Sequence, residues 1–173
     1  MGGEKCERPW RIRKAGERDR VAIEAVVADA FGVYLPRMDR KPYPMLDEYG
    51  AYIRAGQAFV LEEGGTGGED AAQGGIRACI VLVPDADGDL SLEVLAVARD
   101  RQGMGCGRAL VDFAVRHANT LGCRRLKLYT NEVMVEAQAF YTRLGFTETR
   151  HALDAGYRRV FYVMGVPAST PER

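Results

Sequence analysis

The chain has 173 residues, 47% of them apolar, which is typical of one soluble domain with a sizeable core. Its 24 basic and 24 acidic residues balance, so no overall field favours nucleic acid or an anionic membrane as a partner. No apolar run approaches the roughly 20 residues of a membrane span, and residues 1–9 lack the apolar segment of a signal peptide. We therefore expect a cytoplasmic protein with a single domain over residues 1–173, its core at about 8–166 and a frayed tail at 167–173.

The cysteines and histidines predict neither disulfides nor a metal centre. The cysteines are scattered without a Cys-x-x-Cys pair, which favours reduced thiols. The histidines, His117 and His151, are not spaced like ligands of one ion, so we expect no metal. The four cysteines are Cys6, Cys79, Cys106 and Cys123.

Apolar periodicity predicts a mixture of strands and helices along the chain. The first half is expected to hold a strand at 10–13, a helix at 17–31, a loop or broken helix at 32–44, a helix at 46–55 and a strand at 58–62. A flexible turn at 64–68 precedes a strand at 76–83, a hairpin turn at 84–88 and a strand at 90–98. The second half is expected to hold a helix at 105–121 ended by Gly122, a strand at 125–130, a helix at 135–144 and strands at 147–153 and 157–166.

A glycine-rich segment lies between the strand at 90–98 and the next helix. Residues 102–110 read Gln-Gly-Met-Gly-Cys-Gly-Arg-Ala-Leu, and three glycines in five positions allow positive φ angles and a close approach of a ligand to the main chain. The following helix points its unpaired N–H groups and its positive dipole end toward that ligand. The combination of strand, glycine turn and helix start predicts an anion site suited to a pyrophosphate.

The spacing of these glycines distinguishes between kinds of phosphate site. The dinucleotide pattern G-x-G-x-x-G fails because Arg108 and Leu110 stand where the third glycine belongs, and the chain has no Gly-Lys pair for a P-loop. The pattern Q/R-x-x-G-x-G/A is satisfied by Gln102, Gly105 and Gly107, and it resembles the acetyl-CoA motif of the GNAT superfamily of N-acetyltransferases. Residues 137–146 resemble the A-x-x-x-Y-x-x-x-G-F segment of the same family.

The resemblance implies an α/β, single-domain GNAT-like fold, with a mixed central sheet of about seven strands flanked by about four helices. In this family the sheet is splayed beside the glycine-turn helix, and the pantetheine arm of acetyl-CoA enters the splay. An extended ligand with amides can satisfy the main-chain groups that splayed strands leave unpaired. The cofactor-binding residues that the resemblance implies are Leu95, Ala96, Val97, Gln102, Gly103, Met104, Gly105, Cys106, Gly107, Arg108, Asn131 and Tyr141.

The implied function is an acetyl-CoA-dependent N-acetyltransferase. It would transfer the acetyl group to a primary amine of a small molecule, amino acid or peptide by direct attack in a ternary complex. A non-catalytic acyl-CoA-binding or sensing module is the alternative, and a nucleotide-binding protein built on the same turn is a weaker one. No nucleic acid or membrane partner is expected, and a homodimer is implied by the habit of the family.

Two residues are the catalytic candidates. Tyr141 stands at the tyrosine position of the family motif, where the phenol acts as general acid or orients the thiol; packing beside Phe140 and Leu144 is the other interpretation. Glu93 interrupts an apolar strand, which is unfavourable unless the carboxylate is solvated or paired, so we expect it to face the cleft as general base. Strand alternation groups Glu93 with Ser91, Leu95 and Val97, and Leu92 with Val94 and Ala96; an ion pair with Arg77 is the alternative role for Glu93.

The chain departs from the family pattern at one position. Met134 stands where an asparagine is common, and Asn131 could supply the polar contact to the cofactor or simply cap the helix. Cys106 is more simply a small residue in the turn than a reactive thiol. Arg108 could contact a phosphate with its side chain or lie on the solvated face of the helix.

The acceptor pocket is expected between residues 32–52 and the last hairpin. Tyrosine side chains give this wall aromatic surfaces with polar ends, and the predicted pocket residues are Tyr34, Arg37 and Met38. Arg37 could pair with an acceptor carboxylate, because its planar fork matches that group, or with Asp39 or Asp47 at the surface.

Overall fold

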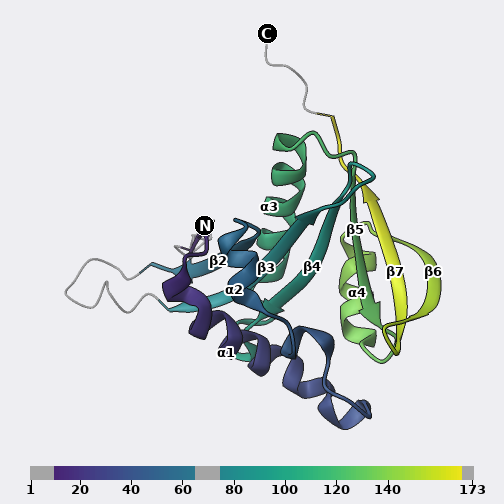
Figure 1. Cartoon of the computed structure of the whole chain (residues 1–173), viewed down its shortest axis with the longest axis horizontal. Coiled ribbons are helices and arrows are strands. Elements are labelled where there is room, and N and C mark those ends of the chain that lie inside the picture. The colour runs from purple at the N-terminus through teal and green to yellow at the C-terminus, as the bar shows by residue number, and fades with distance from the viewer. Residues whose placement is uncertain (1–9, 65–74, 169–173) are drawn as a thin grey trace, which may run out of the picture.

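The computed structural model describes residues 10–64 and 75–168, which form a seven-stranded mixed sheet covered by helices on both faces (Figure 1). The strand order is β1-β2-β3-β4-β5-β7-β6. The strands are β1 (Trp10–Lys14), β2 (Ala58–Glu63), β3 (Ile76–Pro84), β4 (Leu90–Val97), β5 (Arg125–Asn131), β6 (Thr147–Asp154) and β7 (Tyr157–Gly165). The α-helices are α1 (Arg20–Phe31), α2 (Tyr49–Arg54), α3 (Cys106–Thr120) and α4 (Val135–Arg143). Short 3-10 turns are η1 (Glu17–Asp19), η2 (Gly32–Arg37), η3 (Tyr43–Met45) and η5 (Arg99–Arg101).

The predicted fold class is confirmed, and the element bounds differ for local reasons. The helix expected at 46–55 begins only at Tyr49, because the Glu48 carboxylate accepts hydrogen bonds from the main-chain N–H groups of Gly50 and Ala51 and so caps the helix there. Gly122 follows α3 with φ +72°, as expected of a glycine after a helix end. The expected turn at 64–68 and the tail at 167–173 lie largely outside the described residues.

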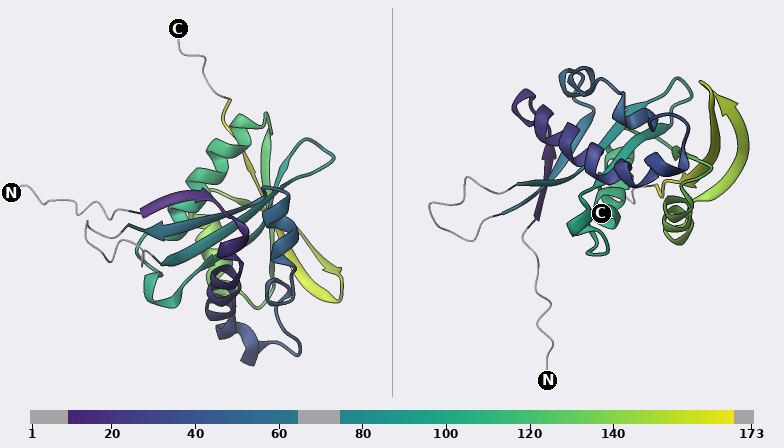
Figure 2. Two further views of the ribbon diagram at one scale, coloured as in Figure 1. Left: turned by 60° about the vertical axis from the view of Figure 1, so that its left-hand side comes forward. Right: turned by 90° about the horizontal axis from the view of Figure 1, so that it is seen from below.

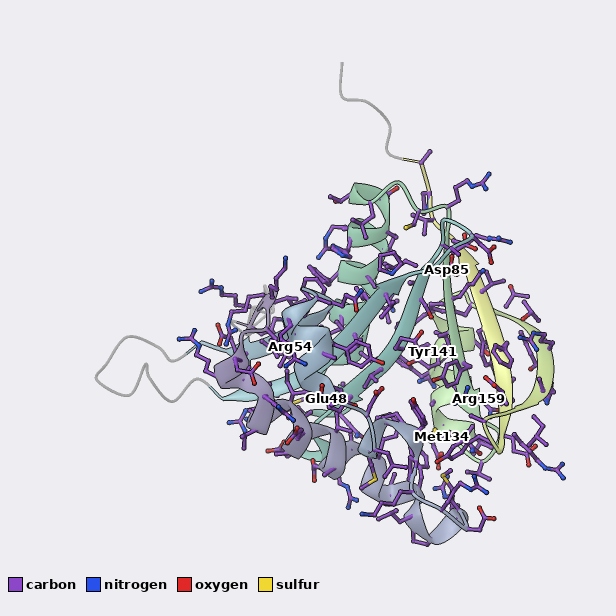
Figure 3. All side chains as sticks on the ribbon, viewed as in Figure 1. Glu48, Arg54, Asp85, Met134, Tyr141 and Arg159 are labelled. Carbon is purple, nitrogen blue, oxygen red and sulfur yellow. The ribbon has the colours of Figure 1, made fainter. Side chains whose placement is uncertain are left out.

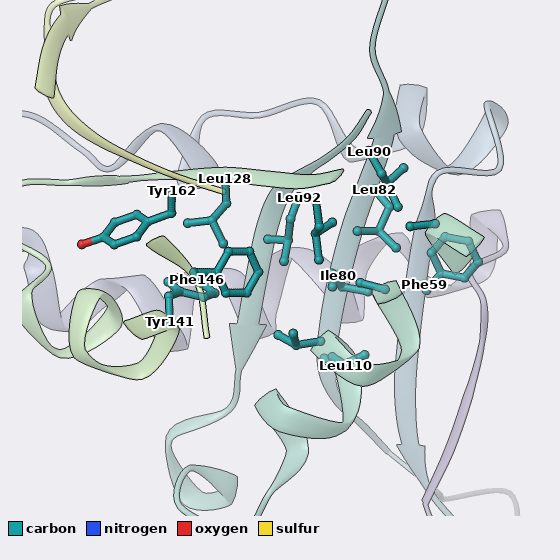
Figure 4. Close-up of a cluster of buried hydrophobic side chains, with 14 of the residues drawn as sticks. Phe59, Ile80, Leu82, Leu90, Leu92, Leu110, Leu128, Tyr141, Phe146 and Tyr162 are labelled. Atoms are coloured by element: carbon teal, nitrogen blue, oxygen red, sulfur yellow. The ribbon is translucent and has the colours of Figure 1, made fainter. Parts of the chain in front are cut away.

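Helices cover the two faces of the sheet in pairs (Figure 2). Ile23 and Val27 of α1 pack with Val60 and Val81 of the sheet, forming a core that α2 completes. On the other face, α3 and α4 cover a second core that Figure 4 shows in part, with Tyr141 and Phe146 among its aliphatic side chains. Among the described residues, no helix is long and apolar enough to cross a membrane.

β4 and β5 separate along their length (Figure 1). They run parallel and pair only where Leu90, Ser91 and Leu92 lie opposite Leu126, Lys127 and Leu128. Beyond these pairs, β4 continues beside β3 to Val97, and β5 continues beside β7 to Asn131. The sheet therefore opens into the predicted splay, with the glycine turn and α3 on one face and η2 and η3 on the other.

A β-bulge at Glu93 overturns the expected grouping of the β4 side chains. Val94 pairs with Val81 and Leu92 pairs with Leu82, so Glu93 has no partner across the β3–β4 ladder. Because the extra residue reverses the alternation, Leu92 belongs to the α3–α4 core, whereas Val94 lies in the α1–α2 core. Grouping Leu92 with Val94 and Ala96 was therefore wrong: Leu92 shares the α3–α4 core with Leu95 and Val97.

Candidate active site

The splay contains a cavity of about 770 Å³. Its α3 side is lined by the glycine turn, the start of α3, the end of β4 and α4, and its η2 side by the end of α1, η2, η3, β5 and β7. The sequence-predicted residues that line it are Tyr34, Met38, Glu93, Leu95, Val97, Gln102, Gly103, Gly105, Gly107, Arg108, Asn131 and Tyr141. Four others do not line it: Arg37, Ala96, Met104 and Cys106.

The glycine turn is shaped by two glycines with different constraints. Gly105 precedes α3 with φ +92°, a left-handed conformation that disfavours other residues, and a Cβ there would meet no atom within 4 Å. A Cβ on Gly107 would instead lie 3.0 Å from Cζ of Phe140, so this glycine lets α3 approach α4. The Gln102 amide donates to the Val97 carbonyl at 3.0 Å, which ties the turn to the end of β4. The open space at Gly105 leaves the N-terminus of α3 accessible to an anion.

Two of the predicted cofactor-binding residues, Ala96 and Cys106, are buried away from the cavity. Ala96 is buried in the α1–α2 core, because the Glu93 bulge directs it away from α3. Cys106 is 1% exposed within the α3–α4 core, which fits a small packing residue. Neither side chain can touch a ligand in the cavity, so any contact would come from their main-chain atoms.

Tyr141 combines both of its predicted roles. Its ring packs edge-on against Phe140 and Phe146, with centroids 5.2 and 5.5 Å away, and only 7% of the residue is exposed. The residue nevertheless lines the cavity, and no described residue forms a hydrogen bond with its hydroxyl. Burial raises the pKa of the Tyr141 phenol above its ordinary value, so the group is protonated at neutral pH and can donate a proton.

Glu93 lies at the opposite side of the opening. Its carboxylate accepts a 2.7 Å hydrogen bond from the Ser91 hydroxyl, and the residue lines the cavity. Arg77, the alternative partner, lies 3.4 Å from a Glu63 carboxylate oxygen instead. The bulge thus presents a carboxylate to the cavity without a described cation paired to it.

Thr130 is a site residue that the sequence analysis missed. It is 5% exposed, lines the cavity, and its hydroxyl has no hydrogen-bond partner among the described residues. An unpaired buried hydroxyl is unfavourable, since it has lost water and gained nothing in exchange. Because Thr130 lies two residues beyond the last β4–β5 pair, a polar ligand entering the splay could supply the missing partner. The site therefore fits an amide-bearing ligand.

Asn131 acts locally in the structure. Its side-chain oxygen accepts a hydrogen bond from the Val133 main chain at 3.1 Å, and Gln138 donates to its carbonyl. This is the turn-capping alternative, although Asn131 also borders the cavity. Met134, at the position where the family has asparagine, is buried at the start of α4, in the part of the molecule where Figure 3 also labels Tyr141 and Arg159.

Arg37 is engaged by a residue that the sequence did not suggest. Its guanidinium forms hydrogen bonds of 2.7 and 2.8 Å to the two carboxylate oxygens of Glu136 in α4, and not to Asp39 or Asp47, the alternative surface partners. The pair with Arg37 lowers the pKa of Glu136 to about 2. Arg37 thus joins η2 to α4 beside the cavity rather than lining it.

The η2 side also contains an aromatic cluster around a buried arginine, which the sequence analysis missed. Arg159 of β7 is 7% exposed, and its guanidinium carbon lies 4.0 Å from the ring centre of Tyr129. The rings of Tyr43 and Tyr157 are each 5.7 Å away. Alternation along β7 could have placed Tyr157 and Arg159 on one face, but not beside residues of η3 and β5.

Comparisons with known proteins agree with this architecture. Residues 23–146 match the model of the Acetyltransferase (GNAT) family. The curated mycothiol acetyltransferase of Geodermatophilus obscurus is 43% identical over 76 residues, which are 44% of this chain and 23% of that protein. The present chain thus covers less than a quarter of that relative.

Solved structures share the fold. The ribosomal-protein-S18-alanine N-acetyltransferase of Escherichia coli superimposes with a TM-score of 0.66 at 18% identity, over 95% of this chain and 98% of that one. The NatC complex bound to Gag peptide and CoA gives a TM-score of 0.65 at 15% identity, over 91% of this chain and 99% of that one. With the family model matching 124 of 173 residues (23 through 146), the chain belongs to the Acetyltransferase (GNAT) family, whose acetyl donor is acetyl-CoA.

Proposed function

We propose that the protein transfers an acetyl group from acetyl-CoA to a primary amine of a small molecule, amino acid or peptide, by direct attack in a ternary complex. The observation that carries this proposal is the single cavity that the glycine turn, Tyr141 and Glu93 all line. A proton donor and a carboxylate thus face one space, next to a helix N-terminus able to hold a diphosphate.

The cofactor residues divide by the part of the ligand they would hold. Main-chain N–H groups from Gly103 to Arg108 bind the pyrophosphate, and the main chain of Leu95 to Val97 pairs with the pantetheine amides. The Thr130 hydroxyl gains its hydrogen-bond partner from the same arm. Bound acetyl-CoA supplies an activated acyl group as a thioester.

Two proton movements accompany the transfer. Glu93 accepts a proton from the acceptor amine, directly or through a water molecule, so that the nitrogen can attack. Tyr141 donates its phenolic proton to the departing sulfur, a role that its raised pKa permits because the group stays protonated at neutral pH. Ser91, which donates to the Glu93 carboxylate, keeps that carboxylate in position.

Location and assembly extend the proposal. Cys79, Cys106 and Cys123 are all buried thiols without a disulfide, which supports a reducing compartment such as the cytoplasm. The homodimer stays a prediction.

The test combines binding with product detection. Calorimetry of the folded protein with acetyl-CoA should show saturable heat, and a broad screen of amines followed by mass spectrometry should reveal a product heavier by one acetyl group. Absence of acetyl-CoA binding contradicts the proposal. Binding without acetylation of any amine would favour the non-catalytic acyl-CoA module instead.

A further inference from the structure

Arg159 is the cation that faces the acceptor half of the cavity. Four arginines line the cavity among the described residues: Arg101, Arg108, Arg143 and Arg159. Arg101 is paired with Glu63, and Arg108 and Arg143 belong to α3 and α4 on the cofactor side. Arg159 alone comes from β7 on the η2 side.

Aromatic rings hold the Arg159 guanidinium flat and leave its edge available. Stacking over Tyr129 at 4.0 Å covers one face, and the tyrosines of η3 and β7 flank it. Nη1 donates to the half-exposed carboxylate of Asp154. No described residue accepts a hydrogen bond from Nε or Nη2, neither atom is sealed from solvent, and the residue lines the cavity.

The sheet places Arg159 close in register to the opening that Glu93, the proposed base, also borders. Pairing of β4 and β5 ends at Leu92 and Leu128, so Glu93 and Tyr129 are the next residues on the two sides of the opening. On β7, Arg159 lies opposite Asn131, two residues beyond Tyr129. Burial, and after it the negative charge of Glu93, raises the pKa of the Tyr129 phenol to about 12 against the opposing charge of Arg159, so both charges act on this hydroxyl.

We propose that Arg159 is a specificity-determining residue that binds a carboxylate on the acceptor, so that the preferred substrates are amines that also carry a carboxylate. This inference rests on the proposed acetyl transfer. A planar fork with one free edge matches a carboxylate, whereas a phosphate is better matched by several cations, and among the described residues the η2 side contributes one arginine to the cavity lining. Tyr129, protonated at neutral pH, donates a second hydrogen bond beside it.

The experiment compares amino acids with the amines left when their carboxylate is removed. Each pair differs only in the group that Arg159 would bind, and pairs of increasing chain length measure the spacing between amine and carboxylate. For the best pair we expect kcat/KM to favour the amino acid by about 10- to 100-fold in the wild type. Titrating the same compounds into the protein with bound CoA measures the preference as Kd, independently of turnover.

Three variants separate recognition from structural support. Arg159→Gln should bring the preference to within about twofold of unity by raising KM for the amino acid, while KM for acetyl-CoA stays unchanged. Arg159→Lys should restore part of this preference, since the positive charge returns without the planar guanidinium group. Asp154→Asn removes the ion-pair partner and leaves Arg159 in place, so the preference should persist.

The outcomes distinguish this inference from the proposed function. Acetylation of amines with no preference for a carboxylate in the wild type overturns the inference alone. A preference that survives Arg159→Gln, or that Asp154→Asn removes equally, also overturns it, since Arg159 would then act only through packing. A protein that does not bind acetyl-CoA contradicts the proposed function itself.

Discussion

Arg37 and Glu136 join η2 to α4 through two parallel hydrogen bonds of 2.7 and 2.8 Å. Arg37 also lies over the ring of Tyr34, with its guanidinium carbon 5.4 Å from the centroid. The two elements belong to opposite faces of the sheet, so this pair bridges the two sides of the cavity, which Glu136 lines.

Removing this pair should loosen η2 without unfolding the protein. Both side chains are more than one-third exposed, so water and salt screen the pair and it contributes little to stability. We expect Glu136→Gln to leave the Tm nearly unchanged and to accelerate hydrogen exchange in residues 32–45. Glu132→Gln, which removes an exposed carboxylate paired with Arg158, is the control. Equal exchange in both variants would show that the pair does not restrain η2.

Tyr141→Phe should separate catalysis from binding. The variant keeps the ring that packs against Phe140 and Phe146 but removes the acidic proton, so kcat should fall by about 10²- to 10⁴-fold. Acetyl-CoA affinity, measured by calorimetry, should change by less than about threefold. Turnover within a few fold of the wild type, followed by thiol release, would exclude Tyr141 as the acid.

Gly105→Val should abolish acetyl-CoA binding. The side chain would occupy the space in front of the α3 N-terminus, in addition to straining a residue with φ +92°. Gly88→Val is the matched control, because Gly88 has φ +78° in the β3–β4 turn, also with nothing within 4 Å of a Cβ. The control should lose comparable stability and keep its affinity. Similar affinities in the two variants would contradict a main-chain phosphate site at Gly105.

Thr130→Val should change stability and affinity in opposite directions. Replacing the unpaired hydroxyl with a methyl group should raise the free energy of unfolding by about 1 kcal/mol. It should also weaken acetyl-CoA binding by about five- to tenfold, since the cofactor loses a hydrogen bond. Thr130→Ser, which keeps the hydroxyl, should retain affinity. Thermal unfolding and calorimetry on the same samples decide it, and unchanged affinity in the valine variant would remove Thr130 from the cofactor site.

Acid should destabilise the fold through Asp89. This carboxylate is 1% exposed and lies 2.9 Å from Arg125 and 2.7 Å from Lys127, which together hold its pKa below the ordinary value of 3.8. A lowered native pKa stabilises the fold above pH about 4, and that stability is lost as the pH falls through the native pKa. Asp89→Asn should lower stability by about 2 kcal/mol at neutral pH and flatten the acid limb of a stability profile. An unchanged acid limb would assign the transition to other carboxylates.

The sequence predicted the fold because periodicity and glycine positions act locally. The alternation in β5 and the helical spacing in α3 depend on neighbours in the chain, and both elements lie where they were expected. The Glu93 bulge was not predictable in this way. The sequence shows a charged residue within an apolar strand, but only the pairing with β3 shows that the alternation reverses there.

The site residues that sequence reasoning missed depend on contacts between distant segments. Arg159 acquires its environment from Tyr43 of η3 and Tyr129 of β5, and the sequence gives no signal that these meet. Arg37 was predicted to line the acceptor pocket, with an acid nearby in the chain as the alternative partner, but its partner Glu136 lies 99 residues away. Thr130 can be recognised only in the structure, which shows that its hydroxyl is buried and has no hydrogen-bond partner among the described residues.

Because the ladder between β4 and β5 is short, binding of a ligand in the splay should affect the stability of the fold. Three residue pairs join the two halves of the sheet, and the next buried hydroxyl on β5 is left unpaired. A ligand that binds the native chain alone increases the population of folded molecules as its concentration rises. Thermal stability is therefore also a measure of the fraction of the protein that has acetyl-CoA bound.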